Sequence, residues 1–567
     1  MKFNDLRQFN DNLLIETDLC IVGSGPAGLS IAKEFVGTNV QVWIVESGGL
    51  EEEPDTQALY NIESIGVPRV MQQEIIRSRI FGGSSHVWTG RCAPFDPLDF
   101  QSRPWIPNSG WPIDREQLDP YLERAGINLG LGPHCYDQRL WELFKVSRPE
   151  PLLDENLLKP AFWQFSKSAK DPAEPTRFGH HFMPEHAPNI NVLLHANVTH
   201  LNTNETGTCL ESIEVSTLEH KRGSIKAKAI ILCCGGIENA RLLLASNRIL
   251  PNGVGNPHDT VGRFLMDHPG CVIGGFDPQR STKVRSRFGQ YWLDNQQGRH
   301  VYLQGVALSP TIQAQEGLLN CAAFLEEYSA PDDPWTALRR LKTALKKQPP
   351  HSSPTVDQAM FWRQPTASAT SGLPPSPYRD VLAVLSHPQI PLQGLYRRFV
   401  KHRPALPKAE RIDLYCLVEQ LPDPSSRITL SETKDALGMP ISKINWQMSD
   451  REMQTVRRLS QVMGQEFKRL GLPQPILANW LNDKENWQSN FIDRAHPIGT
   501  TRISENPQQG VVNSNCQVHG VEGLFIAGSS VFPTTGHANP TLMIVAMSIR
   551  LADWLKINCF HQQGGAA

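Results

Sequence analysis

A glycine-rich turn near the N-terminus holds residue types whose spacing suits the binding of a dinucleotide. Residues 23–28, Gly-Ser-Gly-Pro-Ala-Gly, follow an apolar run at 18–22 and precede a run with helical spacing. Gly23 allows a tight turn, Gly25 lets the backbone approach a pyrophosphate, and Gly28 lets the helix and the strand pack closely. The helix N-terminus adds N–H groups and a positive dipole that favour phosphates. The turn therefore predicts a dinucleotide site.

An acidic residue stands where such a site needs one. A second apolar run, 40–45, ends in Glu46, whose carboxylate can accept hydrogen bonds from ribose hydroxyls. That acceptor favours an adenosine without a 2′-phosphate. NAD and FAD both satisfy this pattern, so the turn and Glu46 leave the choice between them open.

Further strings combine small residues with histidine and asparagine. Residues 81–90, FGGSSHVWTG, form a small-residue loop whose backbone N–H groups can approach a planar ring or a phosphate. Towards the C-terminus come AHPIGTTR at 495–502, VHGVEGLFIAGSSVFP at 518–533 and GHANPTL at 536–542. Together these strings offer an imidazole and an amide beside flexible, glycine-containing backbone.

The strings, in their order along the chain, resemble those of the glucose–methanol–choline (GMC) oxidoreductases, FAD-dependent enzymes that oxidise alcohols. The same resemblance extends to three more segments, CCGGIENAR at 233–241, GRFLMDHP at 262–269 and EQLPDPSSR at 419–427. It covers nearly the whole chain except 335–411 and is closest to the pyranose oxidase branch and to bacterial sugar dehydrogenases. It implies FAD rather than NAD, with the flavin ring facing a substrate-binding domain.

The resemblance also implies roles for individual residues. His496 matches the catalytic base of the family and Asn539 matches its partner, 43 positions further on, a spacing that the family shares. The FAD contacts that it implies are Gly23, Gly25, Pro26, Ala27, Gly28, Glu46, Ser47, Gly82, Gly83, Ser84, Ser85, Val87, Trp88, Val198, Cys234, Gly235, Gly528, Ser529, Asn539, Pro540 and Thr541.

The chemistry of the two catalytic candidates supports their roles. Oxidation of an alcohol needs the hydroxyl proton removed while a hydride leaves the carbon for flavin N5. The neutral imidazole of His496 is suited to take that proton near neutral pH, and the Asn539 amide can donate a hydrogen bond to the alkoxide oxygen. A helix that begins at Pro540 and Thr541 can stabilise negative charge on the reduced flavin.

Other histidines are weaker candidates. We expect His519 to be structural, in a turn before the last strand, whereas for His537 a place in the wall of the substrate cavity and a structural role are equally open. Some family members bind FAD covalently through a histidine after Gly-Gly. That position is Val87 here, and His86 comes one residue early, so we expect dissociable FAD.

The sequence also differs from the family's usual motifs at two places. Trp88 stands where many relatives have asparagine, so flavin contacts there can differ in detail. Arg502, Ile503 and Ser504 replace the usual Arg-Met-Gly.

Asp267 and His268 offer too few ligands for a metal, and the sequence has neither an HExxH string nor an EF-hand loop. We therefore predict no metal site.

Two fold classes follow from the periodicity of the chain. Apolar runs at 18–22, 40–45, 191–195, 227–234 and 523–527 predict strands, with helices at 238–245 and 541–555. They predict a discontinuous α/β Rossmann-like FAD-binding domain, 1–110, 190–270 and 505–567. Strands expected at 411–419, 427–431 and 441–446, with a helix at 449–470, predict an α+β substrate-binding domain with a largely antiparallel sheet, 111–189 and 271–504.

A proline-rich insertion, 335–410, interrupts the second domain. From Trp335 to Arg411 the chain has 13 lysines and arginines against 3 acids, a local charge of +10. We expect a solvated helical insertion there; the alternative is a contact with an acidic protein partner or a membrane.

Length, charge and cysteine content exclude several classes of protein. A chain of 567 residues is long enough for two or more domains. A formal net charge of −2 argues against binding to nucleic acid through bulk charge. The eleven cysteines follow neither a zinc nor a disulfide pattern. With no signal peptide and no transmembrane segment evident, we expect reduced thiols and a cytoplasmic protein.

The sequence thus predicts FAD-dependent oxidation of an alcohol, a secondary hydroxyl of a sugar or glycoside that becomes a ketone. Oxygen or another electron acceptor would reoxidise the flavin. The alternatives are a dehydrogenase for a non-sugar alcohol that passes electrons to a protein or quinone, a redox-neutral lyase or light-driven decarboxylase, and a flavin-binding protein without catalysis.

Overall fold

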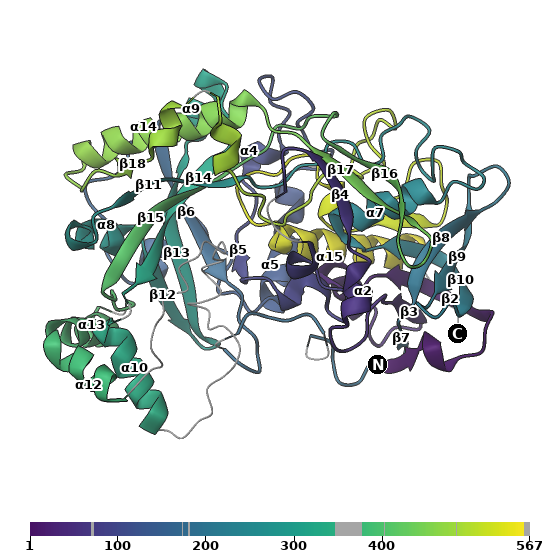
Figure 1. The fold of residues 1–567 in the computed structure, drawn as a ribbon, viewed down its shortest axis with the longest axis horizontal. Helices are drawn as coiled ribbons and strands as arrows, with labels where there is room; N and C mark the ends of the chain where they lie inside the picture. The colour runs from purple at the N-terminus through teal and green to yellow at the C-terminus, as the bar shows by residue number, and fades with distance from the viewer. Residues whose placement is uncertain are drawn as a thin grey trace, which may run out of the picture.

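The computed structural model describes residues 1–69, 73–172, 174–179, 182–330, 332–345, 377–401, 403–483 and 485–560. Two large sheets organise this part of the chain, at opposite ends of the view in Figure 1. One is largely parallel and the other antiparallel, so both kinds of sheet that the sequence predicted are present. The boundaries of the two domains stay a prediction.

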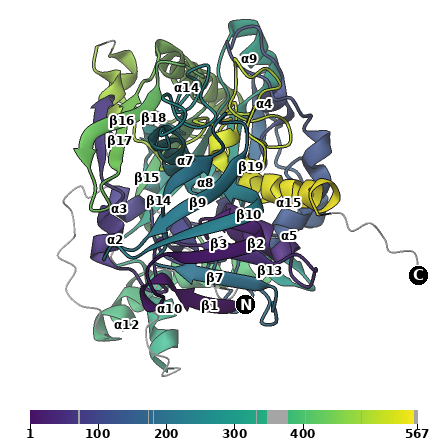
Figure 2. The ribbon, with the colours of Figure 1, turned by 90° about the vertical axis from the view of Figure 1, so that its right-hand side faces the viewer.

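The first sheet has the strand order β1-β7-β3-β2-β10-β9-β8, with β19 also paired to β10. Its pairs are parallel except those that β9 makes with β8 and β10. Figure 2 shows these strands side by side with α15 next to them. The strands are β1 (Lys2–Asp5), β2 (Leu13–Val22), β3 (Val42–Val45), β7 (Ile190–Leu194), β8 (Asn197–Thr203), β9 (Leu210–Ser216), β10 (Arg222–Leu232) and β19 (Leu524–Ile526).

All five strands expected for the nucleotide-binding domain lie in this sheet, with ends shifted by a few residues. The segments that pair in parallel near the cavity edge, such as Leu19–Val22 of β2 and Ile230–Leu232 of β10, are apolar and buried because parallel strands are covered on both faces. Val22, at the end of β2, pairs with Val45 of β3 and with Leu232 of β10. Three strands therefore end together, at the edge where ligands of such sheets bind.

Helices cover this sheet and begin at the same edge. These are α1 (Pro26–Glu34), α7 (Gly235–Ala245) and α15 (Thr541–Asn558). Helix α15 packs between α1 and α5 (Asp119–Asn128). Within the described residues, no helix is both long enough and apolar enough to cross a membrane.

The second sheet has the order β18-β11-β15-β14-β13-β6-β5, with β12 also paired to β13. Every pair is antiparallel. Helix α14 (Asp450–Arg469), which begins at a capping box of Ser449 and Glu452, packs against β14 and β15. The strands are β5 (Arg91–Cys92), β6 (Leu158–Phe165), β11 (Gly270–Phe276), β12 (Gln290–Asn295), β13 (Gly298–Leu308), β14 (Cys321–Ser329), β15 (Ala409–Val418) and β18 (Ile476–Leu477).

The sequence was wrong about the place of two strands. Those expected at 427–431 and 441–446 exist as β16 (Arg427–Lys434) and β17 (Pro440–Trp446), but they are not part of the large antiparallel sheet. They form a three-stranded sheet in which β17 pairs in parallel with β4 (Ile62–Gly66). Alternation of apolar residues predicts a strand but not its partner.

The basic insertion contains α10 (Pro334–Leu345), α12 (Pro377–Ser386) and α13 (Gln389–Phe399). These helices agree with the helical insertion that the sequence predicted, although residues 346–376 lie outside the described residues. Arg340 pairs with Asp380 and so connects α10 to α12. One of the basic side chains is thus used inside the insertion itself.

All eleven cysteines are free thiols in the structure, and eight of them are buried.

Candidate active site

A cavity of about 1360 Å³ lies between the two large sheets and the helices at their edge. This volume exceeds that of a site for one small ligand, so a cofactor and a substrate can occupy it together. The predicted site residues that line it are Gly23, Gly25, Pro26, Glu46, Ser47, Gly83, Ser84, Ser85, Val87, Trp88, Val198, Cys234, Gly235, His496, Ser529, Asn539, Pro540 and Thr541. The structure therefore brings together residues from both ends of the chain.

Four predicted contacts, Ala27, Gly28, Gly82 and Gly528, are not among the lining residues. Two of them shape the wall from behind. A Cβ on Gly28 would lie 2.0 Å from the Gly23 carbonyl oxygen, so only glycine lets α1 approach the turn. A Cβ on Gly82, whose φ is +108°, would lie 1.6 Å from the Phe178 carbonyl oxygen.

Three helix N-termini meet at the cavity. Helix α1 begins after Gly25, α7 after Cys234 and α15 after Pro540, and all three of these residues line the cavity. Each N-terminus presents unpaired N–H groups and a partial positive charge. A Cβ on Gly25 would meet no atom within 4 Å, so this turn leaves space on its cavity side. The arrangement suits a ligand with several anionic groups.

Glu46 stabilises the turn and also faces the cavity. Its carboxylate accepts hydrogen bonds from Ser24 N (3.0 Å), Ser24 Oγ (2.5 Å) and Gly48 N (2.9 Å). Ser24 Oγ in turn accepts a bond from Gly82 N (3.1 Å). The acid predicted to bind ribose therefore also fixes the glycine-rich turn against the 81–90 loop.

The 81–90 loop is held by a segment that the sequence did not single out. Gly83–His86 form a single 3₁₀ turn, and Arg177 donates to the carbonyl oxygens of Ser85 (2.7 Å) and Trp88 (2.9 Å). His86 is exposed, and its Nε2 lies 3.0 Å from the Phe81 carbonyl oxygen. Val87 lines the cavity and His86 does not.

His496 is oriented by a buried acid. The Asp267 carboxylate accepts hydrogen bonds from the backbone N–H groups of Arg494 (3.0 Å) and His496 (3.2 Å) and from the Arg69 guanidinium (2.8 Å). His496 Nδ1 is sealed from solvent without a partner, whereas Nε2 is open to the cavity. Burial lowers the pKa of His496 to about 3, with His268 acting in the same direction. The imidazole is therefore neutral at neutral pH, as a base must be.

Asp267, His268 and His496 place their possible metal-ligand atoms within 4.8 Å of one another. The sequence analysis considered only Asp267 and His268 as possible ligands. The Asp267 carboxylate is already paired with Arg69, and His268 Nε2 lies 3.0 Å from the Thr535 carbonyl oxygen. These contacts make the trio a positioning cluster for His496 rather than a set of free ligands.

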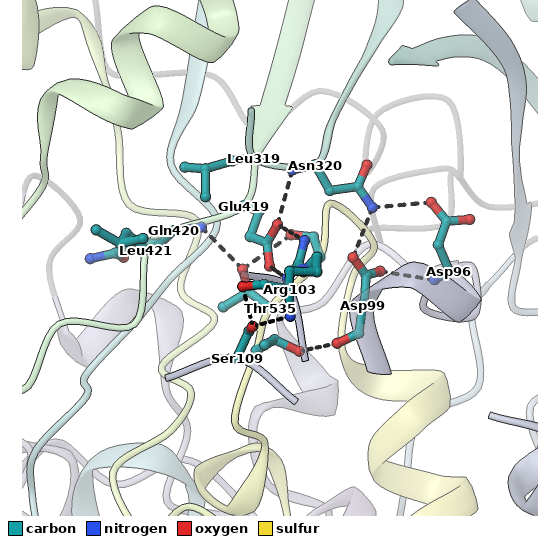
Figure 3. Close-up of polar contacts among 12 residues, drawn as sticks. Asp96, Asp99, Arg103, Ser109, Leu319, Asn320, Glu419, Gln420, Leu421 and Thr535 are labelled. Atoms are coloured by element: carbon teal, nitrogen blue, oxygen red, sulfur yellow. Dashed lines mark hydrogen bonds and ion pairs between the residues drawn. The ribbon is translucent and has the colours of Figure 1, made fainter. Parts of the chain in front are cut away.

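Asn539 follows a segment that is anchored by a buried polar network (Figure 3). Asn320 donates to Asp96 (3.1 Å) and Asp99 (2.9 Å), and Arg103 forms a bidentate ion pair with Glu419. The next residue, Gln420, donates its N–H to Thr535 Oγ1 (3.1 Å). Asn539 itself lines the cavity and has a buried, unpartnered Oδ1.

The two weaker histidine candidates have structural contacts. His537 is not among the lining residues of the cavity; it is buried, and its Nδ1 lies 3.2 Å from Asn320 Oδ1. Of the two roles left open for His537, the structure supports the structural one. His519 Nε2 lies 2.8 Å from the Ser504 carbonyl oxygen, a contact that fits the structural role expected for His519.

Sequence reasoning missed a charged part of the wall. Arg91, Glu326, Tyr415 and Arg494 all line the cavity beside His496. Of these four residues, only Arg494 could have been identified from the sequence, because it stands two positions before His496. The other three lie on strands of the antiparallel sheet, and nothing in their local sequence marks them.

The whole fold has counterparts among solved structures. A formate oxidase structure covers 97% of this chain and is itself covered to 99%, with a TM-score of 0.56 and 20% sequence identity. The C-terminal part, residues 422–548, matches the family model of the GMC oxidoreductases. This part of the chain is a GMC oxidoreductase domain. The protein is a flavin-dependent oxidoreductase of alcohols or sugars.

Two characterised relatives show the range of the GMC oxidoreductases that this chain resembles. The 2-methyl-1,2-propanediol dehydrogenase of Mycolicibacterium austroafricanum is 21% identical over 600 residues, 95% of each chain. The C-glycoside 3-oxidase of Microbacterium trichothecenolyticum is 31% identical over 128 residues, 22% of this chain and 23% of the relative.

Proposed function

We propose that this protein oxidises a secondary hydroxyl of a sugar or glycoside to a ketone, with non-covalently bound FAD as its cofactor. The observation that carries the proposal is a single cavity lined both by the dinucleotide turn and by His496 and Asn539. Similarity to a C-glycoside 3-oxidase supports the sugar part of the proposal.

The residues present fit FAD. The turn at Gly23 and Gly25, with the start of α1, would hold the pyrophosphate, and Glu46 would accept from the ribose. The 81–90 loop and the start of α15 would border the flavin ring. Bound FAD would supply an acceptor for the hydride that leaves the substrate carbon.

The chain's own residues would handle the proton. His496 Nε2 takes the hydroxyl proton while the C–H bond breaks, so the substrate loses one hydride and one proton and becomes a ketone. The Asn539 side chain positions the hydroxyl oxygen by a hydrogen bond. Asp267 holds the backbone of His496 in place throughout.

Anaerobic absorbance of the FAD-loaded protein tests this function. Sugars and glycosides are added one at a time, and we expect bleaching of the flavin band with at least one of them. Bleaching only by simple alcohols or diols would replace the sugar with the substrate class of the dehydrogenase relative. No bleaching by any alcohol would overturn alcohol oxidation and favour a redox-neutral reaction. Admission of air afterwards distinguishes an oxidase from a dehydrogenase.

We also expect FAD to be released on denaturation. Val87 carries no nucleophile, His86 is exposed outside the cavity lining, and burial raises the pKa of the lining thiol of Cys234 to about 12, which leaves it protonated. Acid precipitation should leave a yellow supernatant and a colourless pellet. A pellet that keeps flavin absorbance after washing would show a covalent bond.

A further inference from the structure

Two arginines in the cavity wall lie side by side on a pair of aromatic rings. The Arg91 guanidinium stacks over Phe324, 4.1 Å from the ring centroid, and Arg494 stacks over Tyr415 at 4.9 Å. Phe324 of β14 and Tyr415 of β15 are direct cross-strand partners whose ring centroids are 5.6 Å apart. The sheet thus places two flat cations next to each other.

Neither guanidinium has an anionic partner within the described residues. No hydrogen bond from either side chain to protein is found, and no carboxylate lies within 4.0 Å of them. Arg91 is only 8% exposed. By contrast, neighbouring Arg69 is paired with Asp267 at 2.8 Å, and Arg411 with Asp413 at 3.1 Å. A buried, unpaired cation is costly, so this pair is built for a partner from outside the protein.

The acids near the two arginines do not pair with them directly. The acid that faces both of them is Glu326, 7% exposed, which accepts a 3.4 Å hydrogen bond from the Tyr328 hydroxyl. Burial raises the pKa of Glu326, while Arg494 and Arg91 act in the opposite direction. Asp267 and Asp493 also act on Arg494, but both are bound by Arg69, at 2.8 and 3.0 Å. The two guanidinium groups therefore keep their hydrogen-bond donors free for a carboxylate on a ligand.

The arginines lie near the reacting group. Arg494 is two residues from His496, and both Arg494 and Arg91 line the cavity that His496 faces. The planar fork of a guanidinium binds a carboxylate through two parallel hydrogen bonds. An anion held there would orient the rest of its molecule towards the imidazole.

We propose that the substrate carries a carboxylate in addition to the hydroxyl that is oxidised, and that Arg91 and Arg494 bind this carboxylate. The identity of the ligand as a substrate rests on the proposed alcohol oxidation. The binding of a carboxylate by the two arginines does not depend on it. The substrate class is therefore a hydroxy acid, such as a uronic acid, rather than a neutral sugar.

Matched substrate pairs test the proposal on the FAD-loaded enzyme. D-glucuronate is compared with D-glucose, D-galacturonate with D-galactose, and lactate with 2-propanol. For each substrate, the limiting rate of anaerobic flavin reduction is divided by the apparent Kd. We expect at least one acid to exceed its neutral partner by about 10- to 100-fold. In Arg91→Gln and Arg494→Gln this preference should disappear, mainly through a higher apparent Kd for the acid, with partial recovery in Arg494→Lys. Arg411→Gln, which removes a paired arginine of the same wall, should keep the preference.

A binding measurement separates this proposal from the proposed function. Acetate, which cannot be oxidised as an alcohol, should perturb the flavin spectrum of the wild type with a Kd that rises about 10-fold or more in Arg91→Gln. Acetate binding without bleaching by any alcohol would keep the anion site and reject alcohol oxidation. Equal use of acids and neutral sugars, with no acetate effect, would reject the anion site and keep alcohol oxidation. A preference for sugar phosphates over uronates would also overturn it.

Discussion

Replacement of His496 by alanine is expected to lower the rate of flavin reduction by about 10²- to 10⁴-fold, the usual contribution of a positioned general base. The imidazole is the group that lines the cavity with an open Nε2 and a pKa lowered to about 3 by burial. Its backbone is fixed by Asp267, and this contact survives truncation of the side chain. Stopped-flow absorbance under anaerobic conditions measures the effect.

His519→Ala is the matched control for this prediction. Its imidazole contacts only the Ser504 carbonyl oxygen among the bonds found for its ring, so the rate of flavin reduction should stay close to that of the wild type. The FAD content of both variants, read from absorbance, shows whether the cofactor is still bound. A His496→Ala enzyme with full FAD and more than a tenth of the wild-type rate would remove His496 from the role of base.

The parts of the site that could be predicted from the sequence are those formed by short, contiguous sequence motifs. The turn at Gly23, the loop at Gly83 and the start of α15 at Pro540 combine a bend, a helix start and a small side chain within a few residues. Local chemistry is enough to identify such strings. Their meeting in one cavity follows from the parallel order of β2, β3 and β10, whose ends must share an edge.

The parts that the sequence missed depend on the pairing of distant strands. Arg91 and Arg494 are about 400 positions apart, and they are neighbours only because β14 and β15 pair Phe324 with Tyr415. No local periodicity sets that register. The same limit explains why the strand at 441–446 was assigned to the wrong sheet, since its partner β4 lies near the N-terminus.

His537 shows a different limit. It stands two residues before Asn539, and the loop could present either side chain to the cavity. What decides the matter is Asn320, whose amide meets both the His537 ring and the Asp99 carboxylate. Burial also raises the pKa of Asp99 to about 7, with Glu419 and Asp96 acting in the same direction. A crowded cluster of acids beneath the cavity is thus a property of the fold, not of any one string.

The ion pair at the centre of that cluster gives the largest stability effect that we expect. Arg103→Met should lower the free energy of unfolding by about 3–5 kcal/mol, because it leaves a buried carboxylate without its cation. Glu419 is fully buried, and its two oxygens receive bonds of 2.8 and 2.5 Å from Arg103 and one of 2.9 Å from Asn320 N. Urea unfolding of the FAD-loaded protein measures the change.

An exposed ion pair supplies the comparison for Arg103. Arg299 pairs with Asp294 at 2.8 Å on the surface, so Arg299→Met should cost only about 0–1 kcal/mol. Replacing Arg103 and Glu419 together by methionine should cost less than Arg103→Met alone, since no unpaired charge is then buried. If Arg103→Met and Arg299→Met lowered the free energy of unfolding equally little, the buried network would not stabilise the segment at Thr535. Because Gln420 and Asn320 hold the residues that lead directly into Asn539, Arg103→Met should also disturb the position of Asn539.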